Sequence, residues 1–237
     1  YASSGELNAS LSGNHPFTLE AEVKQTESKG LNVLLSKGDQ QLGLRADPYE
    51  GGIVLRFFVK TETQSWVQNE YHAPADWLNN WHHVAAVFDG SRLAVYCDGE
   101  ALSPFSGDNQ VASPISASDS PFGVNYDAVN PDRTGKNLYT KVRVYKKALS
   151  AREIAAQMAA DQGKGNYAVG ADDPSVLLWL DFSDAVSKLD DSIYDYYAEA
   201  GREDMAGRYY AFGGDWNDPA NHQDYCNNGL ISSDRTP

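Results

Sequence analysis

Two apolar segments separated by an Asp-Gly pair constrain the fold of this chain more than any other feature. Residues 82–88 read HHVAAVF, residues 93–97 read LAVYC, and Asp89-Gly90 lies between them. Glycine accepts the positive φ that tight hairpin turns require, so the pattern predicts a β-hairpin, and the Asp-Gly pair at 98–99 predicts the next reversal. Apolar residues occur on both faces of the first strand, which is typical of a strand at the centre of a β-sandwich.

The segments around this hairpin indicate further strands. Residues 17–24 alternate strictly between apolar and polar side chains, so one face of that strand should pack while the other, with Glu20, meets water. A short helix is predicted near residue 150, because Ser150 and Glu153 form a capping box ahead of an alanine-rich segment. The remaining strands are expected at 31–36, 42–46, 53–60, 66–68, 122–124, 139–145 and 176–182, the last apolar on both faces and therefore buried. The predicted fold is an all-β sandwich with one short helix.

Length, charge and cysteine content limit the classes of function. The 237 residues suffice for one sizeable core, and the net charge of -14 argues against a nucleic-acid partner, since such binding rests on Lys and Arg at phosphates. No apolar run approaches the roughly 20 residues that a membrane-spanning helix needs. Cys97 and Cys226 are too few for a disulfide framework or a zinc site of their own, so both are expected as free thiols. The chain begins at Tyr1 without a signal peptide or an initiator Met, so we expect a piece of a longer protein.

The order of several motifs resembles laminin G-like domains of the concanavalin A-like superfamily. These motifs are PFTLEAEV at 16–23, LSKG at 35–38, WHHVAAVFDG at 81–90, VYCDG at 95–99 and VRVYKKALSAREI at 142–154. They occur in a consistent order within residues 1–183, which is more specific than any short motif alone. The resemblance implies a concanavalin A-like jelly-roll sandwich of two antiparallel sheets, with the short helix after the strand 139–145.

A second resemblance concerns residues 209–237, which follow an acidic segment, 184–208, expected to be a linker. The motifs FGGDWNDP at 212–219, DYCNNGLI at 224–231 and DRTP at 234–237 are similar to the late catalytic-barrel segment of the β-galactosidases of glycoside hydrolase family two. The resemblance implies that Tyr225 and Asn228 belong to the substrate and alkali-cation site of an intact parent enzyme. In this chain we expect the segment to be an irregular C-terminal tail.

Exposed aromatic side chains are candidate carbohydrate contacts, because their faces can stack against sugar rings. The candidates near predicted loops are Tyr49, Trp66, Tyr71 and Trp77. Trp77 follows a Pro-Ala-Asp segment and is equally consistent with a packing anchor. Trp81 and Trp179 are predicted to belong to the core.

Candidate metal ligands form a separate group. Laminin G-like domains often hold a calcium ion in a loop, and the oxygen-rich residues Asp127, Asn130 and Asp132 are the candidates here. Ordinary turn chemistry selects the same residue types, so both explanations stay open. His82 and His83 are adjacent on a strand, where neighbouring side chains point to opposite faces and cannot share one ion.

No catalytic residue is expected in the chain itself. Retaining glycosidases need two carboxyl groups, and neither catalytic Glu of the second family occurs in the tail; Glu70, which follows an Asn, lies in the sandwich. The sequence therefore predicts a non-catalytic accessory module of a β-galactosidase-like glycoside hydrolase, which recognises carbohydrate or shapes access to the cleft of the parent. We expect it in the bacterial periplasm or at the cell exterior rather than in the cytoplasm. The alternative is a module that packs against other proteins or domains and binds no sugar.

Overall fold

A computed structural model describes residues 4–182, apart from residues 29, 39–40, 64, 108, 128 and 131–132. The linker and tail that the sequence predicts, 184–208 and 209–237, lie outside the described residues. No helix among the described residues combines the length and the apolar character that crossing a membrane requires.

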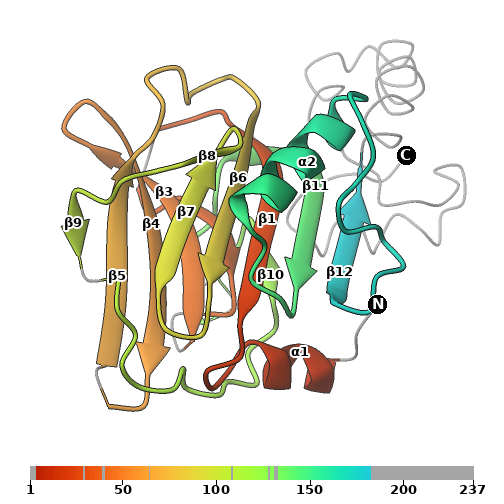
Figure 1. Cartoon of the computed structure of the whole chain (residues 1–237). Helices are drawn as coiled ribbons and strands as arrows, with labels where there is room; N and C mark the ends of the chain where they lie inside the picture. Colours follow the sequence, from red (N-terminus) through yellow and green to blue (C-terminus); the bar gives the residue numbers. More distant parts are fainter. Residues whose placement is uncertain are drawn as a thin grey trace, which may run out of the picture. The chain divides into compact units, whose positions relative to one another are not determined.

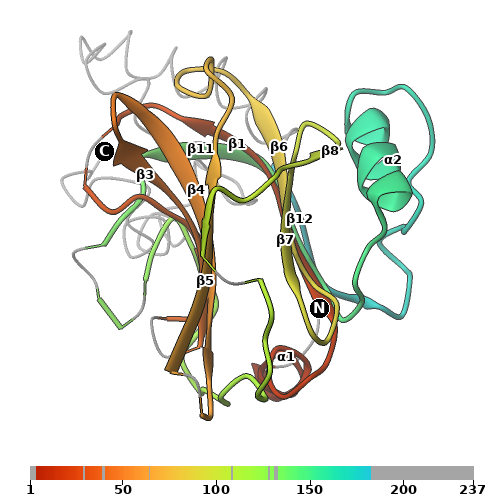
Figure 2. The ribbon, with the colours of Figure 1, turned by 60° about the vertical axis from the view of Figure 1, so that its left-hand side comes forward.

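Within the described residues, twelve strands form two six-stranded sheets that face each other (Figures 1 and 2). Sheet I has the order β12-β11-β1-β6-β7-β8 and sheet II the order β10-β2-β3-β4-β5-β9. The strands of sheet I are β1 (Phe17–Gln25), β6 (His82–Phe88), β7 (Leu93–Cys97), β8 (Glu100–Ala101), β11 (Asn137–Tyr145) and β12 (Val176–Asp181). Those of sheet II are β2 (Val33–Ser36), β3 (Leu42–Tyr49), β4 (Gly52–Thr61), β5 (Ser65–His72), β9 (Ser106–Gly107) and β10 (Gly123–Val124). The predicted all-β sandwich of two antiparallel sheets is confirmed.

The core lies between the two sheets, where Phe17 makes one aromatic contact across to sheet II and one within sheet I. Phe17 of β1 meets Phe57 of β4 edge-on at 6.3 Å between ring centroids, and it meets Phe88 of β6 at 5.5 Å. Every residue of β6 is buried, because one face packs in this core and the other is covered from outside. The hairpin around Asp89-Gly90 is therefore central, as its apolar residues on both faces predict.

The outer cover of sheet I is helix α2 (Ala151–Asp161), which begins with the predicted capping box. The Glu153 backbone N–H donates to the Ser150 hydroxyl, and the Glu153 carboxylate accepts from the Ser150 backbone N–H. Ile154 of α2 packs against Ala85 and Val87 of β6. Figure 2 shows α2 outside the layer that contains β6, β7 and β12.

Glu20 is fully buried, so the prediction that it faces water is wrong. Its carboxylate accepts from His83 Nε2 at 2.6 Å and from the Tyr145 hydroxyl at 2.7 Å, and Arg143 Nη1 lies 3.2 Å away. The guanidinium of Arg143 also forms an ion pair with Asp161 of α2, and it lies 4.3 Å from the centroid of the Trp179 ring. These ion pairs offset the free-energy cost of burying the charged groups. The alternation of the sequence does not predict the pairs.

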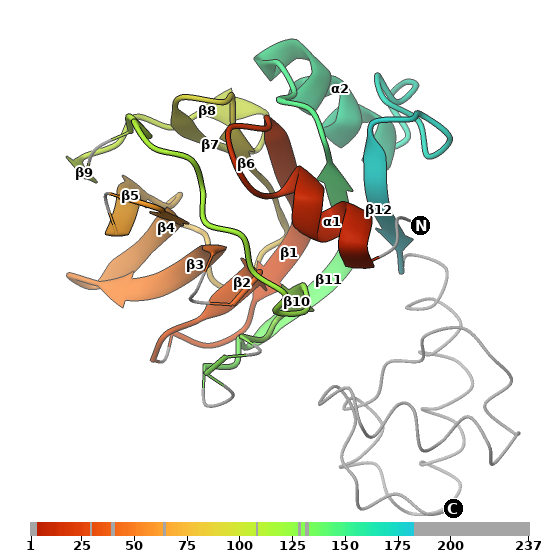
Figure 3. The same cartoon turned by 90° about the horizontal axis from the view of Figure 1, so that it is seen from below.

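Other details depart from the sequence-based expectations. Strand β12 is an edge strand in which only Leu177 is buried, so its expected burial on both faces is wrong. Trp81 is 40% exposed rather than part of the core, and Trp179 is half-buried. A second helix, α1 (Ser4–Ser10), was not expected and has no buried residue. Figure 3 shows the segment between β9 and β10 crossing the same end of the sandwich as α1.

Candidate functional site

The outer face of sheet II is the candidate site, because it combines partly exposed aromatic rings with hydrogen-bonding groups. Alternation along β3, β4 and β5 places one set of side chains in the core, with Phe57, and the other set outside. In the described part of the chain, neither helix covers this outer face (Figure 2). Apart from glycines, its members are Arg45, Asp47, Tyr49, Val54, Arg56, Phe58, Lys60, Trp66, Gln68, Glu70 and His72.

One end of this face is an aromatic platform. Trp66 is 43% exposed and supplies the accessible ring, and it meets Phe58, which is only 5% exposed and supports it from below, edge-on at 5.6 Å between ring centroids. The Phe58 ring lies close to the backbone of Gly43, its register partner on β3, where a Cβ atom would come within 2.5 Å of the ring. Arg45 lies over Phe58 at 5.1 Å and Lys60 over Trp66 at 5.8 Å, so both rings carry a cation near their faces. A shallow cavity of about 240 Å³ opens beside Trp66.

A row of charged groups crosses the middle of the face. Arg56 Nε donates to Glu70 Oε1 at 2.7 Å, and Arg56 Nη1 donates to Asp47 Oδ2 at 2.5 Å. The Gln68 amide donates to the same Glu70 oxygen at 3.0 Å. Partial burial lowers the pKa of Arg56, but its hydrogen bonds to the two carboxylates outweigh burial and raise it. These ion pairs and hydrogen bonds therefore fix the side chains of the row, which present oxygen and nitrogen atoms for hydrogen bonds at the surface.

A second aromatic cluster, formed by Tyr49, His72 and Phe105, lies at the other end of the face. His72 stacks on Phe105 at 4.0 Å between ring centroids, and Tyr49 lies 5.4 Å from Phe105. The negative charge of Glu50 raises the pKa of the Tyr49 hydroxyl above its ordinary range. Along β4, six residues separate the partners of Trp66 and His72, which places the two aromatic ends about 20 Å apart.

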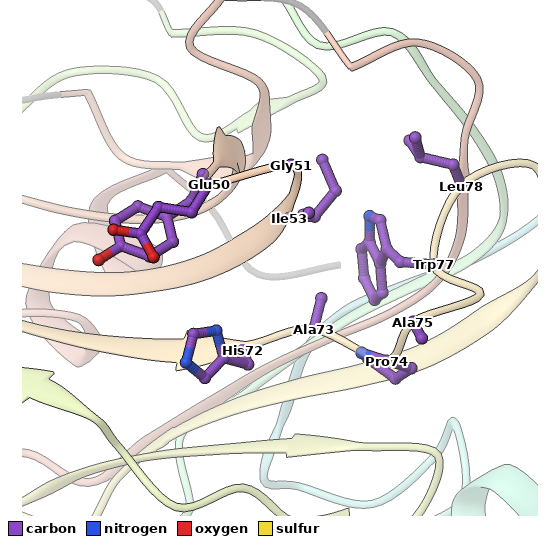
Figure 4. Close-up of a pocket in the computed structure, with 11 residues that line it drawn as sticks. Glu50, Gly51, Ile53, His72, Ala73, Pro74, Ala75, Trp77 and Leu78 are labelled. Carbon is purple, nitrogen blue, oxygen red and sulfur yellow. The ribbon is translucent and has the colours of Figure 1, made fainter.

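A cavity of about 280 Å³ adjoins this second cluster (Figure 4). The β3–β4 turn lines one side with Glu50 and Gly51, and the segment from His72 to Leu78, which leaves β5, lines the other. Figure 4 shows the His72 and Trp77 rings on opposite sides of Ala73. The cavity is thus continuous with the outer face of sheet II through Tyr49 and His72.

The structure divides the four predicted aromatic contacts into two pairs. Trp66 and Tyr49 belong to the outer face of sheet II, at its opposite ends. Tyr71 and Trp77 are each only 1% exposed, so the expectation that they are exposed is wrong. Tyr71 points into the core, because the alternation of β5 turns it away from His72, and its hydroxyl accepts from the Asn69 amide. Trp77 donates from Nε1 to Gln25 at 2.6 Å, which agrees with its alternative interpretation as a packing anchor.

The candidate calcium ligands show turn geometry where the structure describes them. Asp127 is buried, and its Oδ1 accepts from the backbone N–H groups of Val129, at 2.9 Å, and Asn130, at 3.2 Å. Asp132 lies outside the described residues, so the calcium site stays a prediction. Tyr225 and Asn228 also lie outside them.

Several residues of the site were not found from the sequence. Phe58 follows Phe57 in a largely apolar strand, where the sequence does not show which of the two rings faces the core, and Arg56 is a lone charged residue beside them. Phe105 lies in a Ser- and Pro-rich segment, and only the pairing of β9 with β5 brings it to His72. The one available signal was the alternation of β5, which separates Trp66 and His72 from Tyr71.

Comparison with known proteins agrees with this architecture. The family model described as the concanavalin A-like lectin/glucanases superfamily matches residues 1–155. A solved structure of a candidate carbohydrate-binding protein from Bacteroides ovatus has a TM-score of 0.53 at 18% identity, over 72% of this chain and 46% of that protein. This chain thus corresponds to less than half of that protein. A heptameric SAP-like pentraxin from Limulus polyphemus has a TM-score of 0.49 at 16% identity, over 72% of this chain and 81% of the pentraxin.

No curated protein sequence matches the chain. The family model nevertheless covers well over half of the 237 residues, and the two observed six-stranded sheets are the architecture that the motifs predict. The chain belongs to the concanavalin A-like lectin/glucanase superfamily.

Proposed function

We propose that this chain is a carbohydrate-binding module that holds its ligand against the outer face of sheet II. The observation that carries the proposal is the Trp66–Phe58 platform beside the row of Arg56, Glu70 and Gln68. Aromatic faces stack against the C–H groups of a sugar ring, while amide, guanidinium and carboxylate groups bond its hydroxyls. The solved structure from Bacteroides ovatus, described as a candidate carbohydrate-binding protein, supports this assignment.

The dimensions of the face favour an oligosaccharide over a single sugar. Its two aromatic ends lie about 20 Å apart along β4, with polar groups between them. The charges of Arg56 are already paired with Asp47 and Glu70, which favours a ligand bound through neutral hydroxyls. We therefore expect a neutral glycan chain that stacks on Trp66 and runs toward Tyr49.

A matched pair of tryptophan variants tests this function. Trp66 and Trp81 are 43% and 40% exposed, but only Trp66 lies on the outer face of sheet II. A glycan array would first identify a ligand, and calorimetric titration would then compare Trp66→Ala and Trp81→Ala. Loss of one stacking contact is worth about 1.4 kcal/mol, or about tenfold in Kd, and we expect this loss in Trp66→Ala alone. Equal affinity of both variants and the unaltered chain would refute the proposed surface.

Absence of binding to every glycan on the array would contradict the proposed function itself. The alternative, a module that packs against proteins or domains, would then gain support from a stable dimer in light scattering. Because that measurement needs no sugar, it separates the two functions in one preparation.

We further propose that residues 1–183 serve as a non-catalytic accessory module of a β-galactosidase-like glycoside hydrolase. This rests on the motifs at 212–219, 224–231 and 234–237, and on them alone. In such a parent, Tyr225 and Asn228 would contribute to the substrate and alkali-cation site, and the module would bind glycan or shape access to the cleft. The isolated chain is expected to leave a chromogenic galactoside intact. A barrel strand with a catalytic Glu, encoded beside this segment, would support the parentage, and its absence from both flanks would contradict it.

A further inference from the structure

Three side chains with different metal-binding atoms converge at the end of the β6–β7 hairpin. His82 begins β6, Cys97 ends β7, and Asp98 occupies the turn that follows. The Nδ1 atom of His82 lies 2.8 Å from Asp98 Oδ2, and the Cys97 Sγ atom lies 3.7 Å from the same oxygen. One atom from each residue lies within 4.8 Å of the others. From this convergence we propose that His82, Cys97 and Asp98 form a binding site for a thiophilic divalent cation such as Zn²⁺.

Two of the three separations suit zinc with only small shifts, and the third, between the ligand atoms of His82 and Cys97, is at most 4.8 Å. Zinc bonds of about 2.0–2.3 Å to N, O and S in a tetrahedral arrangement separate an N and an O ligand by roughly 3.3 Å, and an S and an O ligand by roughly 3.5 Å. The observed separations of 2.8 and 3.7 Å lie on either side of these values. Imidazole, thiolate and carboxylate together select zinc or cadmium over calcium or magnesium, which prefer oxygen ligands.

The surroundings hold each ligand in place. His82 Nε2 lies 3.3 Å from the carbonyl oxygen of Asp76, so its N–H donates there and leaves Nδ1 to face the site. The ring also stacks on Trp77 at 4.9 Å between centroids. Asp98 Oδ1 accepts the backbone N–H of His83 at 3.0 Å, which aims Oδ2 at the other two ligands. Asp98 adopts φ 51 in its turn, so its placement depends on this local geometry.

Charge and exposure also favour a cation at this position. The negative charges of Asp76 and Asp98 act on both His82 and Cys97. His82 and Cys97 are buried, whereas the Asp98 side chain is 44% exposed and gives access from solvent. Three protein ligands leave a fourth position for water. Binding replaces the thiol proton of Cys97 and the proton shared by His82 and Asp98, and both protons pass to solvent.

A second cluster of possible metal ligands is unsuitable for a divalent cation. Glu20, His83 and Asp161 also bring ligand atoms within 4.8 Å. There, however, the guanidinium of Arg143 contacts both carboxylates and already supplies the positive charge. A divalent ion would have to displace a fully buried arginine, so this cluster is structural.

Cadmium binding to the full chain, kept reduced with a phosphine, tests the site directly. A cadmium–thiolate charge-transfer band of one-to-one stoichiometry is expected in the near ultraviolet. The variant Cys97→Ser should lose the band, whereas the matched control Cys226→Ser should keep it. A band that survives in Cys97→Ser, or that disappears in Cys226→Ser, would overturn the assignment.

Zinc titration of Asp98→Asn gives a second readout if the Cys97 variant fails to fold. Asn tolerates the left-handed φ of this turn, and its side-chain oxygen can still accept the His83 N–H. We expect zinc to raise the Tm of the unaltered chain and to bind Asp98→Asn at least tenfold more weakly. Equal zinc affinity in the two proteins would refute the role of Asp98. Glycan binding through Trp66 is a separate measurement, so failure of either proposal leaves the other standing.

Discussion

Replacement of Gly43 by alanine should destabilise the protein, although glycine is ordinarily a poor residue within a strand. Its φ lies outside the left-handed region, so alanine fits the backbone, and the side chain alone decides the effect. A Cβ atom at this position would lie 2.5 Å from Cζ and 3.0 Å from Cε1 of Phe58. Carbon atoms in contact prefer about 3.5–4.0 Å, so the ring must move by about 1 Å.

The expected magnitude follows from two opposing effects. Replacing glycine in a strand interior by alanine contributes about 0.5–1 kcal/mol of stability where nothing obstructs the methyl group. Overpacking of a filled site costs about 1–3 kcal/mol. Phe58 is held between Gly43, Trp66 and Arg45, so it cannot move without disturbing a neighbour. We therefore expect a net loss of about 1–2 kcal/mol in the free energy of unfolding, together with weaker glycan binding as Trp66 shifts.

Urea unfolding followed by tryptophan fluorescence measures this loss, with Gly52→Ala as the matched control. Gly52 is likewise a strand residue, in β4, with a backbone that accepts alanine, but a Cβ atom there would meet only the Tyr49 carbonyl oxygen at 3.7 Å. The control should be neutral or slightly stabilised, and both variants should keep the m-value of the unaltered chain. If Gly43→Ala is as stable as Gly52→Ala, the Phe58 ring does not rest on Gly43 and the description of the platform is wrong.

Two further predictions concern the buried ion cluster beneath α2. Arg143→Met should lower the free energy of unfolding in urea by about 3–5 kcal/mol, because it leaves Glu20 and Asp161 without their buried cation. The control Lys146→Met, which removes an exposed ion pair, should change it by less than about 1 kcal/mol. Similar losses in both variants would contradict the claim that the buried ion pairs matter more than the exposed one. Burial raises the pKa of Glu20, but His83 and Arg143 outweigh it and hold that pKa below its ordinary value of 4.5. Stability from Glu20 is therefore present above pH 4.5 and is lost as the pH falls through the lowered value, so acid unfolding curves of Glu20→Gln should be flatter there than those of the unaltered chain.

Most of the sandwich follows from local sequence patterns. The second Asp-Gly pair forms the expected two-residue turn, with Asp98 and Gly99 at φ 51 and 82, because this geometry depends on those two residues alone. The first hairpin has a longer loop than a tight turn, since the Asp89 carboxylate accepts the backbone N–H groups of Ser91 and Arg92 and extends the reversal. The capping box of α2 was equally predictable, because both of its partners lie within four residues.

Features that depend on distant neighbours were not predictable in this way. The alternation of β1 indicates which side chains share a face, but it cannot show that α2 and Arg143 cover Glu20. Trp66 and Tyr71 are both aromatic and lie in one strand. The register of β5 against β4 decides that one is exposed and the other buried. Phe105 reaches the site only through the short strand β9, which its own sequence does not mark.

The unequal cover of the two sheets explains why the candidate site lies on sheet II. The outer face of sheet I is covered by α2, and removal of this helix would take Asp161 away from the fully buried Arg143. On sheet II the ion pairs of Arg56 are satisfied within the face itself, so they need no covering helix. A ligand can therefore approach Trp66 without displacing any part of the described fold. Binding on sheet I would first require α2 to leave the strands it packs against, and this cost makes the outer face of sheet II the surface on which a glycan is to be sought.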